Sequence, residues 1–282
     1  MIQIKNYVAI FCISLLAISC NNSNTKDSVP KKTKDTRPKI EMVTDYGSMI
    51  IRLYNETPYH RDNFINLARN NAFDSLLFHR VIKEFMIQAG DPDSKNANPT
   101  DTLGEGDAPY MVKAEFNSKL FHKKGVIAAA RDNNPEKASS AMQFYITQGK
   151  VQNDSLLDNA ELYINKNKAI DFLRETNRDS PLLDSLDLAM TERNRQLYKT
   201  YSDSVYKLVK NQKNFNAYSI PEDQKEIYKT IGGTPHLDQG YTVFGEVISG
   251  IEVIDSIANV ETDNMDRPIN DVRILDVKIL DK

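Results

Sequence analysis

The segment FHRVIKEFMIQAGDP, residues 78–92, decides how the rest of the chain is interpreted. Its apolar runs are interrupted by a basic residue, Arg80, and by an amide, Gln88. If the segment forms two strands, the simplest interpretation is a core strand pair with Arg80 extending its charge to water. The alternative is that Arg80, Phe85, Met86 and Gln88 line a pocket, since residues two apart in a strand share a face.

A second apolar segment, MQFYI at residues 142–146, repeats this combination. Gln143 and Tyr145 share one face of the expected strand. Two strands therefore each present a glutamine and a large side chain on the same side. A glutamine on a buried face must be hydrogen-bonded, because unpaired buried polar atoms are costly. The two segments together predict a groove with apolar walls and a few polar groups.

The flanking sequence predicts a mainly β fold. Residues 40–54 alternate as a hairpin around Asp45-Tyr46-Gly47, and residues 57–73 have helical spacing. Further strand-like runs follow, and a short helical segment at 250–260 precedes a half-buried closing strand at 271–280. Many strands with two short helices at opposite ends of the set favour a closed antiparallel barrel with helical caps.

A helical insertion interrupts these strands between residues 152 and 231, where the apolar period changes from two to about 3.6. Helices are expected at 156–173 and after Ser219, where a capping box is possible. Between them, apolar residues at steps of three and four predict one helix of roughly 30 residues. These residues are Leu183, Leu186, Met190, Leu197, Tyr201, Val205 and Leu208. Such an insertion could be a dimer contact, a client clamp or a spacer, and the sequence leaves this open.

Four segments, FHRVIKEFMIQAGDP, GVIAAAR, MQFYI and GGTPHLDQGYTVFGEVISG, resemble motifs of the cyclophilin family of peptidyl-prolyl cis–trans isomerases, in the family's order. The resemblance covers residues 40–281 apart from the insertion. It implies an eight-stranded antiparallel barrel closed by two helices, in agreement with the strand pattern. It also implies an enzyme that isomerises X–Pro bonds without a cofactor or a metal.

The resemblance assigns site residues position by position. Arg80 matches the catalytic arginine of the family. The substrate-binding positions are Phe85, Met86, Gln88, Ala130, Arg131, Gln143, Tyr145, His236, Leu237 and Tyr241. Arg131 stands where many members have asparagine, and Tyr145 stands at a phenylalanine position. His236 replaces a tryptophan, which implies weak binding of cyclosporin, and Tyr241 replaces the histidine of many eukaryotic members.

Two functions of different classes fit these residues. In the first, the chain is an active isomerase in which Arg80 stabilises a twisted X–Pro amide. In the second, it is a non-catalytic chaperone or binding module of cyclophilin fold that holds clients in the groove or on the insertion. The presence of Arg80, Gln88 and Gln143 favours the isomerase. His236 and the large insertion leave the non-catalytic binding module as an alternative.

The amino terminus predicts export. Lys5 precedes an apolar run at residues 7–18 that ends before Cys20, which is typical of a signal sequence. The stretch LLAISC resembles a bacterial lipoprotein signal, in which Cys20 receives lipid. The other interpretation is an ordinary cleaved signal that leaves one unpaired cysteine. Residues 21–39 are polar and contain prolines, so a flexible tether is expected.

We therefore expect a signal at 1–19, a lipidated cysteine and tether at 20–39, a barrel at 40–151 and 232–282, and the insertion at 152–231. The expected location is the bacterial cell envelope, at the outer membrane or facing the periplasm. The expected partners are proline-containing segments of exported proteins, together with the membrane that holds the lipid. The oligomeric state is not predicted.

Other function classes are disfavoured by composition and spacing. A net charge of -3 and a pI near 5.9 give no electrostatic case for nucleic acid. The 4 histidines lack the tight spacing of metal ligands. The pair Ser139-Ser140 is not in a nucleophile-elbow context, so the sequence gives little support to acyl transfer.

Overall fold

The structure is a computed structural model that describes residues 36–280. The predicted signal, the expected lipidation site Cys20 and most of the expected tether lie outside the described residues. No helix within residues 36–280 is long and apolar enough to span a bilayer. At the start of the described part, the Arg37 guanidinium lies 5.2 Å from the centre of the Tyr54 ring. The last residues of the expected tether therefore already contact the folded domain.

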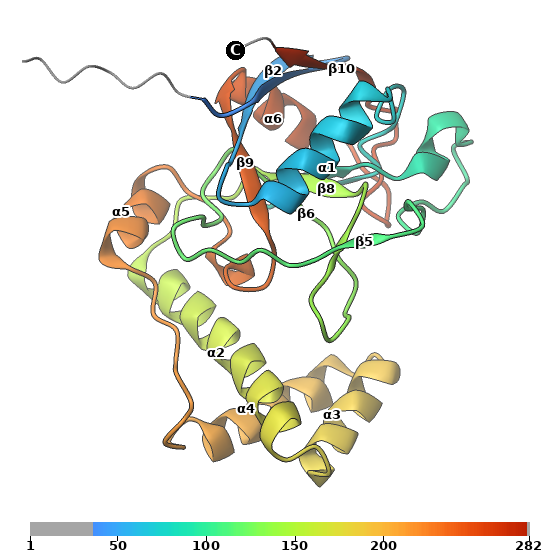
Figure 1. The fold of residues 1–282 in the computed structure, drawn as a ribbon. Helices are drawn as coiled ribbons and strands as arrows, with labels where there is room; N and C mark the ends of the chain where they lie inside the picture. The colour runs from blue at the N-terminus through green and yellow to red at the C-terminus, as the bar shows by residue number, and fades with distance from the viewer. Residues whose placement is uncertain (1–35, 281–282) are drawn as a thin grey trace, which may run out of the picture. The chain divides into compact units, whose positions relative to one another are not determined.

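Eight strands form one curled antiparallel sheet in the order β10-β1-β2-β9-β6-β8-β4-β3, and β5 pairs separately with β7 (Figure 1). The strands are β1 Lys39–Thr44, β2 Gly47–Leu53, β3 Arg80–Ile82, β4 Met86–Ala89, β5 Met111–Val112, β6 Val126–Ala129, β7 Ser139–Ser140, β8 Phe144–Thr147, β9 Val243–Ser249 and β10 Ile274–Leu280. The mainly β prediction and its eight-stranded sheet are confirmed.

The expectation of a closed barrel is wrong, because the sheet is open between its end strands β3 and β10. The chain just before β3 approaches β10 through single contacts, such as the isolated bridge between Leu77 and Arg273. The Phe78 amide also donates to the Val272 carbonyl at 2.9 Å. These bonds fall outside both strands, and β3 is only 3 residues long. A continuous ladder, which closure requires, therefore cannot form there.

Two helices, α1 Pro58–Arg69 and α6 Ile251–Ala258, supply apolar residues to the larger core of the sheet, as expected for helical caps. α1 follows Thr57 at its N-cap position, and the Thr57 side chain makes no cap hydrogen bond. The opposite face of strands β4, β6, β8 and β9 carries a smaller apolar cluster. The sheet thus has a core face and a second face that is free to build a site.

The hairpin of β1 and β2 and the last strand match the sequence prediction. Gly47, at the turn, has φ 124°, a value that residues with a Cβ rarely adopt. In β10 the buried positions move from Ile274 to Val277, a step of three. The pairing with β1 shifts register between Val43 and Thr44, so β10 has one extra residue at this point. The bulge therefore explains the break in alternation.

The insertion contains α2 Asp154–Thr176, α3 Pro181–Thr191, α4 Arg195–Val209 and α5 Glu222–Thr230. The expectation of one long central helix is wrong, because the chain breaks between α3 and α4. Arg193 has φ 53°, and the Asn194 side chain accepts from the Leu197 amide to cap α4. The capping-box expectation is also wrong, since α5 has Pro221 at its N-cap position with no side-chain cap bond. α2, α3 and α4 are grouped together in Figure 1, and they share one apolar cluster.

Candidate functional site

The site begins with a row of side chains across three neighbouring strands. Arg80 on β3 lies opposite Gln88 on β4, and Gln88 lies opposite Tyr145 on β8. Because opposite residues of an antiparallel pair have their side chains on the same face, the row faces the side away from the main core. Met86 and Tyr145 are in the smaller cluster, whereas Phe144 is in the main core. The predicted sharing of faces is confirmed.

A directed chain of hydrogen bonds runs through the row. Nη1 of Arg80 donates to Oε1 of Gln88 at 3.4 Å, and Nε2 of Gln88 donates to Oε1 of Gln143 at 3.0 Å. Nε2 of Gln143 then donates to the carbonyls of Gly104 and Gly106, both at 2.8 Å. In each glutamine side chain, the oxygen accepts from the residue nearer Arg80 and the nitrogen donates to a group farther from Arg80. The carbonyls of the glycine-containing loop therefore set the orientation of both glutamines.

Beside this chain is an open groove of about 140 Å³. Its lining residues are Arg80, Phe85, Met86, Gln88, Ala130, Arg131, Tyr145, Leu237 and Tyr241. The structure thus brings together nine of the eleven site residues that the sequence suggested. Gln143 lies behind Gln88 and orients it, and His236 lies beside Phe85. The groove has apolar walls and a charged edge, as the two strand segments predicted.

Phe85 is in the groove for a reason that strand alternation does not give. It directly precedes β4, in the turn after β3, where Glu84 has φ 61°. In a continuous strand, Phe85 and Met86 would point to opposite faces. Because Phe85 lies in the turn and not in the strand, its side chain does not have to point away from that of Met86, and both side chains line the groove.

Tyr145 is held at the base of the groove by a buried polar network. A hydrogen bond of 2.9 Å joins its hydroxyl to Nε2 of His122, and one of 2.8 Å joins Nδ1 of His122 to Asp238. Tyr228 of α5 donates to the other Asp238 oxygen at 2.7 Å. Burial raises the pKa of the Tyr145 phenol well above its usual value. The sequence analysis missed His122, Asp238 and Tyr228 because they are far apart in the chain, and no spacing rule connects them.

The rim opposite Arg80 is formed by Arg131 and Tyr241. The Arg131 guanidinium lies over the Tyr241 ring, 4.9 Å from its centre, and Nε of Arg131 donates to the Gly240 carbonyl at 2.8 Å. Stacking and hydrogen bonding together hold the guanidinium against the rim. Arg131 is therefore fixed to the protein on one side while it lines the groove.

His236 forms part of an aromatic contact at the edge of the groove. Its ring stacks on Phe85 with centroids 5.6 Å apart, and the edge contact with Tyr163 of α2 measures 6.1 Å. Burial, assisted by the nearby His122, lowers the pKa of His236 to about 4. The ring is therefore neutral near pH 7 and presents an uncharged aromatic surface.

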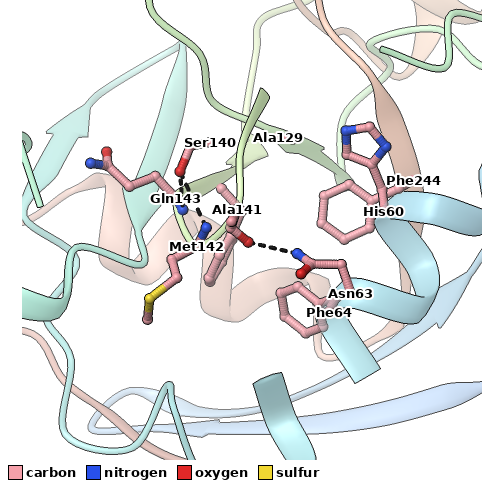
Figure 2. Close-up of a pocket in the computed structure, with 10 residues that line it drawn as sticks. His60, Asn63, Phe64, Ala129, Ser140, Ala141, Met142, Gln143 and Phe244 are labelled. Carbon is pink, nitrogen blue, oxygen red and sulfur yellow. Dashed lines mark hydrogen bonds between the residues drawn. The ribbon is translucent and has the colours of Figure 1, made fainter. Parts of the chain in front are cut away.

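A tighter cavity of about 10 Å³ lies under α1, with room for about one water molecule (Figure 2). Asn63 donates its amide to the Ala141 carbonyl at 2.7 Å there. Nearby, His60 contacts Ser139 at 3.0 Å and Glu115 at 2.7 Å, in a serine–histidine–glutamate arrangement. Ser139 is 1% exposed, so no acyl group can reach its hydroxyl. We interpret this cluster as a structural link between α1 and β7.

Comparison with known proteins identifies the family. The model of the cyclophilin type peptidyl-prolyl cis-trans isomerase/CLD family matches residues 39–166 and 222–279. The matched residues make up more than half of the 282-residue chain. The chain belongs to the cyclophilin-type peptidyl-prolyl cis–trans isomerase family, and we describe it from here on as an enzyme of that type.

Individual relatives agree with this assignment. A Staphylococcus haemolyticus protein provisionally named a peptidyl-prolyl cis-trans isomerase is 27% identical over 253 residues, which are 89% of this chain and 96% of that protein. A Streptococcus pyogenes protein provisionally named a bifunctional phosphatase/peptidyl-prolyl cis-trans isomerase is 26% identical over 87% of this chain, but the match spans only 39% of its length.

The fold has a solved counterpart. The crystal structure of a Cryptosporidium parvum cyclophilin type peptidyl-prolyl cis-trans isomerase matches with a TM-score of 0.52 at 17% identity. The match covers 87% of this chain and 99% of that chain. This similarity supports the fold assignment alone.

Proposed function

We propose that this isomerase acts by placing the Arg80 guanidinium beside the prolyl nitrogen of a twisted X–Pro amide. The observation that carries the proposal is the position of Arg80, which lines the same groove as the apolar side chains of Phe85 and Met86. Its side chain is 44% exposed, and Gln88 and Asp266 contact it at 3.4 and 3.5 Å. It is therefore oriented by the protein and still accessible to a peptide.

The reaction needs no bond cleavage. The barrier of about 18–20 kcal/mol comes from amide conjugation, which is lost at the twisted transition state. The prolyl nitrogen then gains a lone pair that can accept a hydrogen bond. A guanidinium fixed at that position interacts more strongly with the twisted form than with the planar forms. Such differential binding is what lowers the barrier.

The apolar part of the groove supports binding of the proline ring. Phe85, Met86 and Leu237 offer apolar surface next to the Tyr145 ring. Gln88 lies further along β4, where it bonds to Gln143, and it suits the polar acyl side of the X–Pro bond. Arginine fits the role of Arg80 because its guanidinium stays charged and presents a rigid set of donors.

We also propose that the substrates are proline-containing segments of exported proteins, and that the enzyme is a lipoprotein of the bacterial cell envelope. The support for this part is the sequence of the first 20 residues: a basic start, a short apolar run and Cys20. The polar residues that follow would hold the domain away from the membrane surface. The proposed location is at the outer membrane or facing the periplasm.

The alternative is a binding module of cyclophilin fold that captures clients without useful catalysis. His236 at a tryptophan position and the insertion favour it, since α2 brings Tyr163 to the groove edge. A paired assay separates the two proposals. The protein without residues 1–20 is tested for cis–trans exchange in a proline peptide, together with Arg80→Ala and, as a control, Arg61→Ala. Arg61 is on α1, paired with Asp62, and is not among the residues that line the groove.

The isomerase proposal predicts that the unsubstituted protein and Arg61→Ala accelerate exchange equally, while Arg80→Ala stays folded and loses most of the acceleration. If all three proteins bind the peptide but leave the exchange rate unchanged, the binding module is correct. If Arg80→Ala is as active as the unsubstituted protein, the assigned role of Arg80 is wrong.

A further inference from the structure

Aromatic rings continue from the groove onto the insertion. Phe85 lines the groove and stacks on His236 at an interplanar angle of 26°. His236 in turn meets the Tyr163 ring edge-on at 78°, and Tyr163 belongs to α2. Half of the Tyr163 side chain is exposed, at 50%. An aromatic surface with free area therefore adjoins the peptide groove.

Tyr163 also contributes to the electrostatic environment of Tyr241. Burial raises the pKa of the Tyr241 phenol, the Arg131 guanidinium opposes this rise, and the nearby Tyr163 phenol adds to it. The Tyr145 and Tyr241 rings are 5.9 Å apart in an edge contact. Tyr163 thus contacts His236, which directly precedes Leu237 of the groove lining.

Tyr163 is held in position by the way α2 is anchored. Its neighbours in sequence, Ile164 and Asn165, are buried. Asn165 donates to the Tyr218 carbonyl at 2.9 Å and accepts from the Tyr218 amide at 2.7 Å. Further along the helix, Asp171 pairs with Lys137 of the loop that follows Arg131. The helix is therefore held by Tyr218 of the insertion next to Tyr163, and by Lys137 of the groove domain further along.

The direction along the groove follows from β4. Phe85 directly precedes the strand, whereas Gln88 lies near its far end and bonds to Gln143. Tyr163 contacts His236, and His236 stacks on Phe85. Tyr163 is therefore at the Phe85 end of the groove, opposite the end with the two glutamines. If the glutamines hold the acyl side of the X–Pro bond, the residue after the proline faces Tyr163.

We propose that Tyr163 is a specificity-determining residue that favours substrates with an aromatic side chain directly after the proline. The inference rests on the proposed function, because it uses the same groove and the same peptide direction. Aromatic pairs add binding energy beyond simple burial when ring edges and faces meet. Tyr163 supplies a half-exposed ring for such a contact, and the insertion thereby takes part in substrate selection.

The test compares two proline peptides that differ only in the residue after the proline, phenylalanine or alanine. For the purified full chain, kcat/KM is measured for both peptides and expressed as a ratio. Tyr163→Ala should lower the phenylalanine-to-alanine ratio by about threefold to tenfold, the size of one aromatic contact. Tyr163→Phe should retain the ratio, because the ring remains. Tyr59→Ala is the matched control, since Tyr59 is a 62% exposed tyrosine on helix α1 and is not among the residues that line the groove.

An unchanged ratio in Tyr163→Ala would overturn the inference, and so would an equal loss for both peptides. An equal shift in Tyr59→Ala would overturn it as well. If the unsubstituted chain isomerises neither peptide, the proposed function fails, and affinities for the same two peptides then decide the role of Tyr163. Loss of a binding preference for the phenylalanine peptide in Tyr163→Ala supports the inference, and unchanged affinities contradict it. Thermal unfolding confirms that each variant is folded.

Discussion

Arg80 and Gln88 lie directly opposite each other on β3 and β4, and Arg80 Nη1 donates to Gln88 Oε1 at 3.4 Å. The contact uses one nitrogen of the guanidinium and leaves other donors on the exposed side of the side chain. The position of the Arg80 charge thus depends on the orientation of a neutral amide. That orientation depends in turn on Gln143 and on the loop carbonyls of Gly104 and Gly106.

The first prediction concerns Gln143, which is not in the groove lining. Gln143→Ala removes the donor to Gly104 and Gly106 and the acceptor for Gln88, so Gln88 and Arg80 lose their fixed geometry. Because small misplacements of reacting groups are costly, kcat/KM should fall by about tenfold to a hundredfold. The measurement is cis–trans exchange of a proline peptide.

Gln152→Ala is the matched control for this change. Gln152 also donates its amide to two carbonyls, those of Lys150 and Gly233, but it is not among the groove residues. It should lose a similar amount of stability, about 1–3 kcal/mol, with unchanged activity. Equal loss of activity in both variants would show that Gln143 acts only through stability.

The second prediction concerns Tyr145 and its buried network. Tyr145→Phe removes the hydroxyl that bonds to His122 Nε2 and leaves a buried nitrogen without this partner. The free energy of unfolding should fall by about 1–3 kcal/mol. Activity should change little, because the ring that lines the groove remains. Denaturant unfolding and peptide exchange measure the two effects, and a variant as stable as the unsubstituted protein would contradict the assigned network.

The third prediction is a pH dependence of stability. The pKa of His236 is lowered to about 4 by burial, against an ordinary value of 6.5 in the unfolded chain. Between these values the unfolded state binds a proton that the folded state does not, so stability falls as the pH drops from 6.5 toward 4. The contribution of His236 should reach about 3 kcal/mol at the acid end.

His236→Gln removes this contribution, so the unfolding free energy of the variant should depend less steeply on pH in that range. Denaturant unfolding at several pH values measures the slope. NMR titration of the imidazole checks the cause directly. A His236 pKa at or above 6.5 would contradict the burial described for this ring.

The fourth prediction tests the proposed lipid anchor. Cys20→Ser should abolish lipid attachment and move the protein out of the membrane fraction, because a serine hydroxyl cannot replace the thiol in that modification. Cys12→Ser is the control, since Cys12 lies inside the apolar run and has no assigned role. Mass spectrometry of the mature amino terminus gives the readout. An unmodified Cys20, or membrane association of both variants, would show that the proposal is wrong.

The sequence predicted the groove better than it predicted the shape of the sheet. Alternation in MIQA and in QFYI placed Gln88 and Tyr145 on one face, because each strand has one buried core side and the period of a strand is two. Closure of the sheet could not be predicted in this way. It depends on backbone hydrogen bonds such as those from Phe78 to Val272 and from Ile274 to Leu76, which join segments nearly 200 residues apart and leave no local pattern.

The helical insertion shows a second limit of sequence patterns. The apolar spacing correctly placed Leu183, Leu186 and Val205 in the shared apolar cluster. It was wrong for Met190, Leu197 and Leu208, which are exposed, and it did not predict the break between the two helices. That break depends on Arg193 in a left-handed conformation and on the cap formed by Asn194. The contact of Tyr163 with His236 was likewise not predictable, because it joins helix α2 to a 3-10 turn 73 residues further along the chain.

The most direct test of the central claim measures peptide binding separately from rotation about the X–Pro bond. NMR exchange spectroscopy on an enzyme–peptide mixture gives both the affinity for the peptide and the cis–trans rate of the bound peptide. If Arg80 stabilises the twisted amide, Arg80→Ala should change the Kd by less than about threefold and lower the bound rate by about a hundredfold to a thousandfold. An Arg80→Ala variant that binds the peptide much more weakly, but isomerises the X–Pro bond of the bound peptide as fast as the unsubstituted enzyme, would contradict this account.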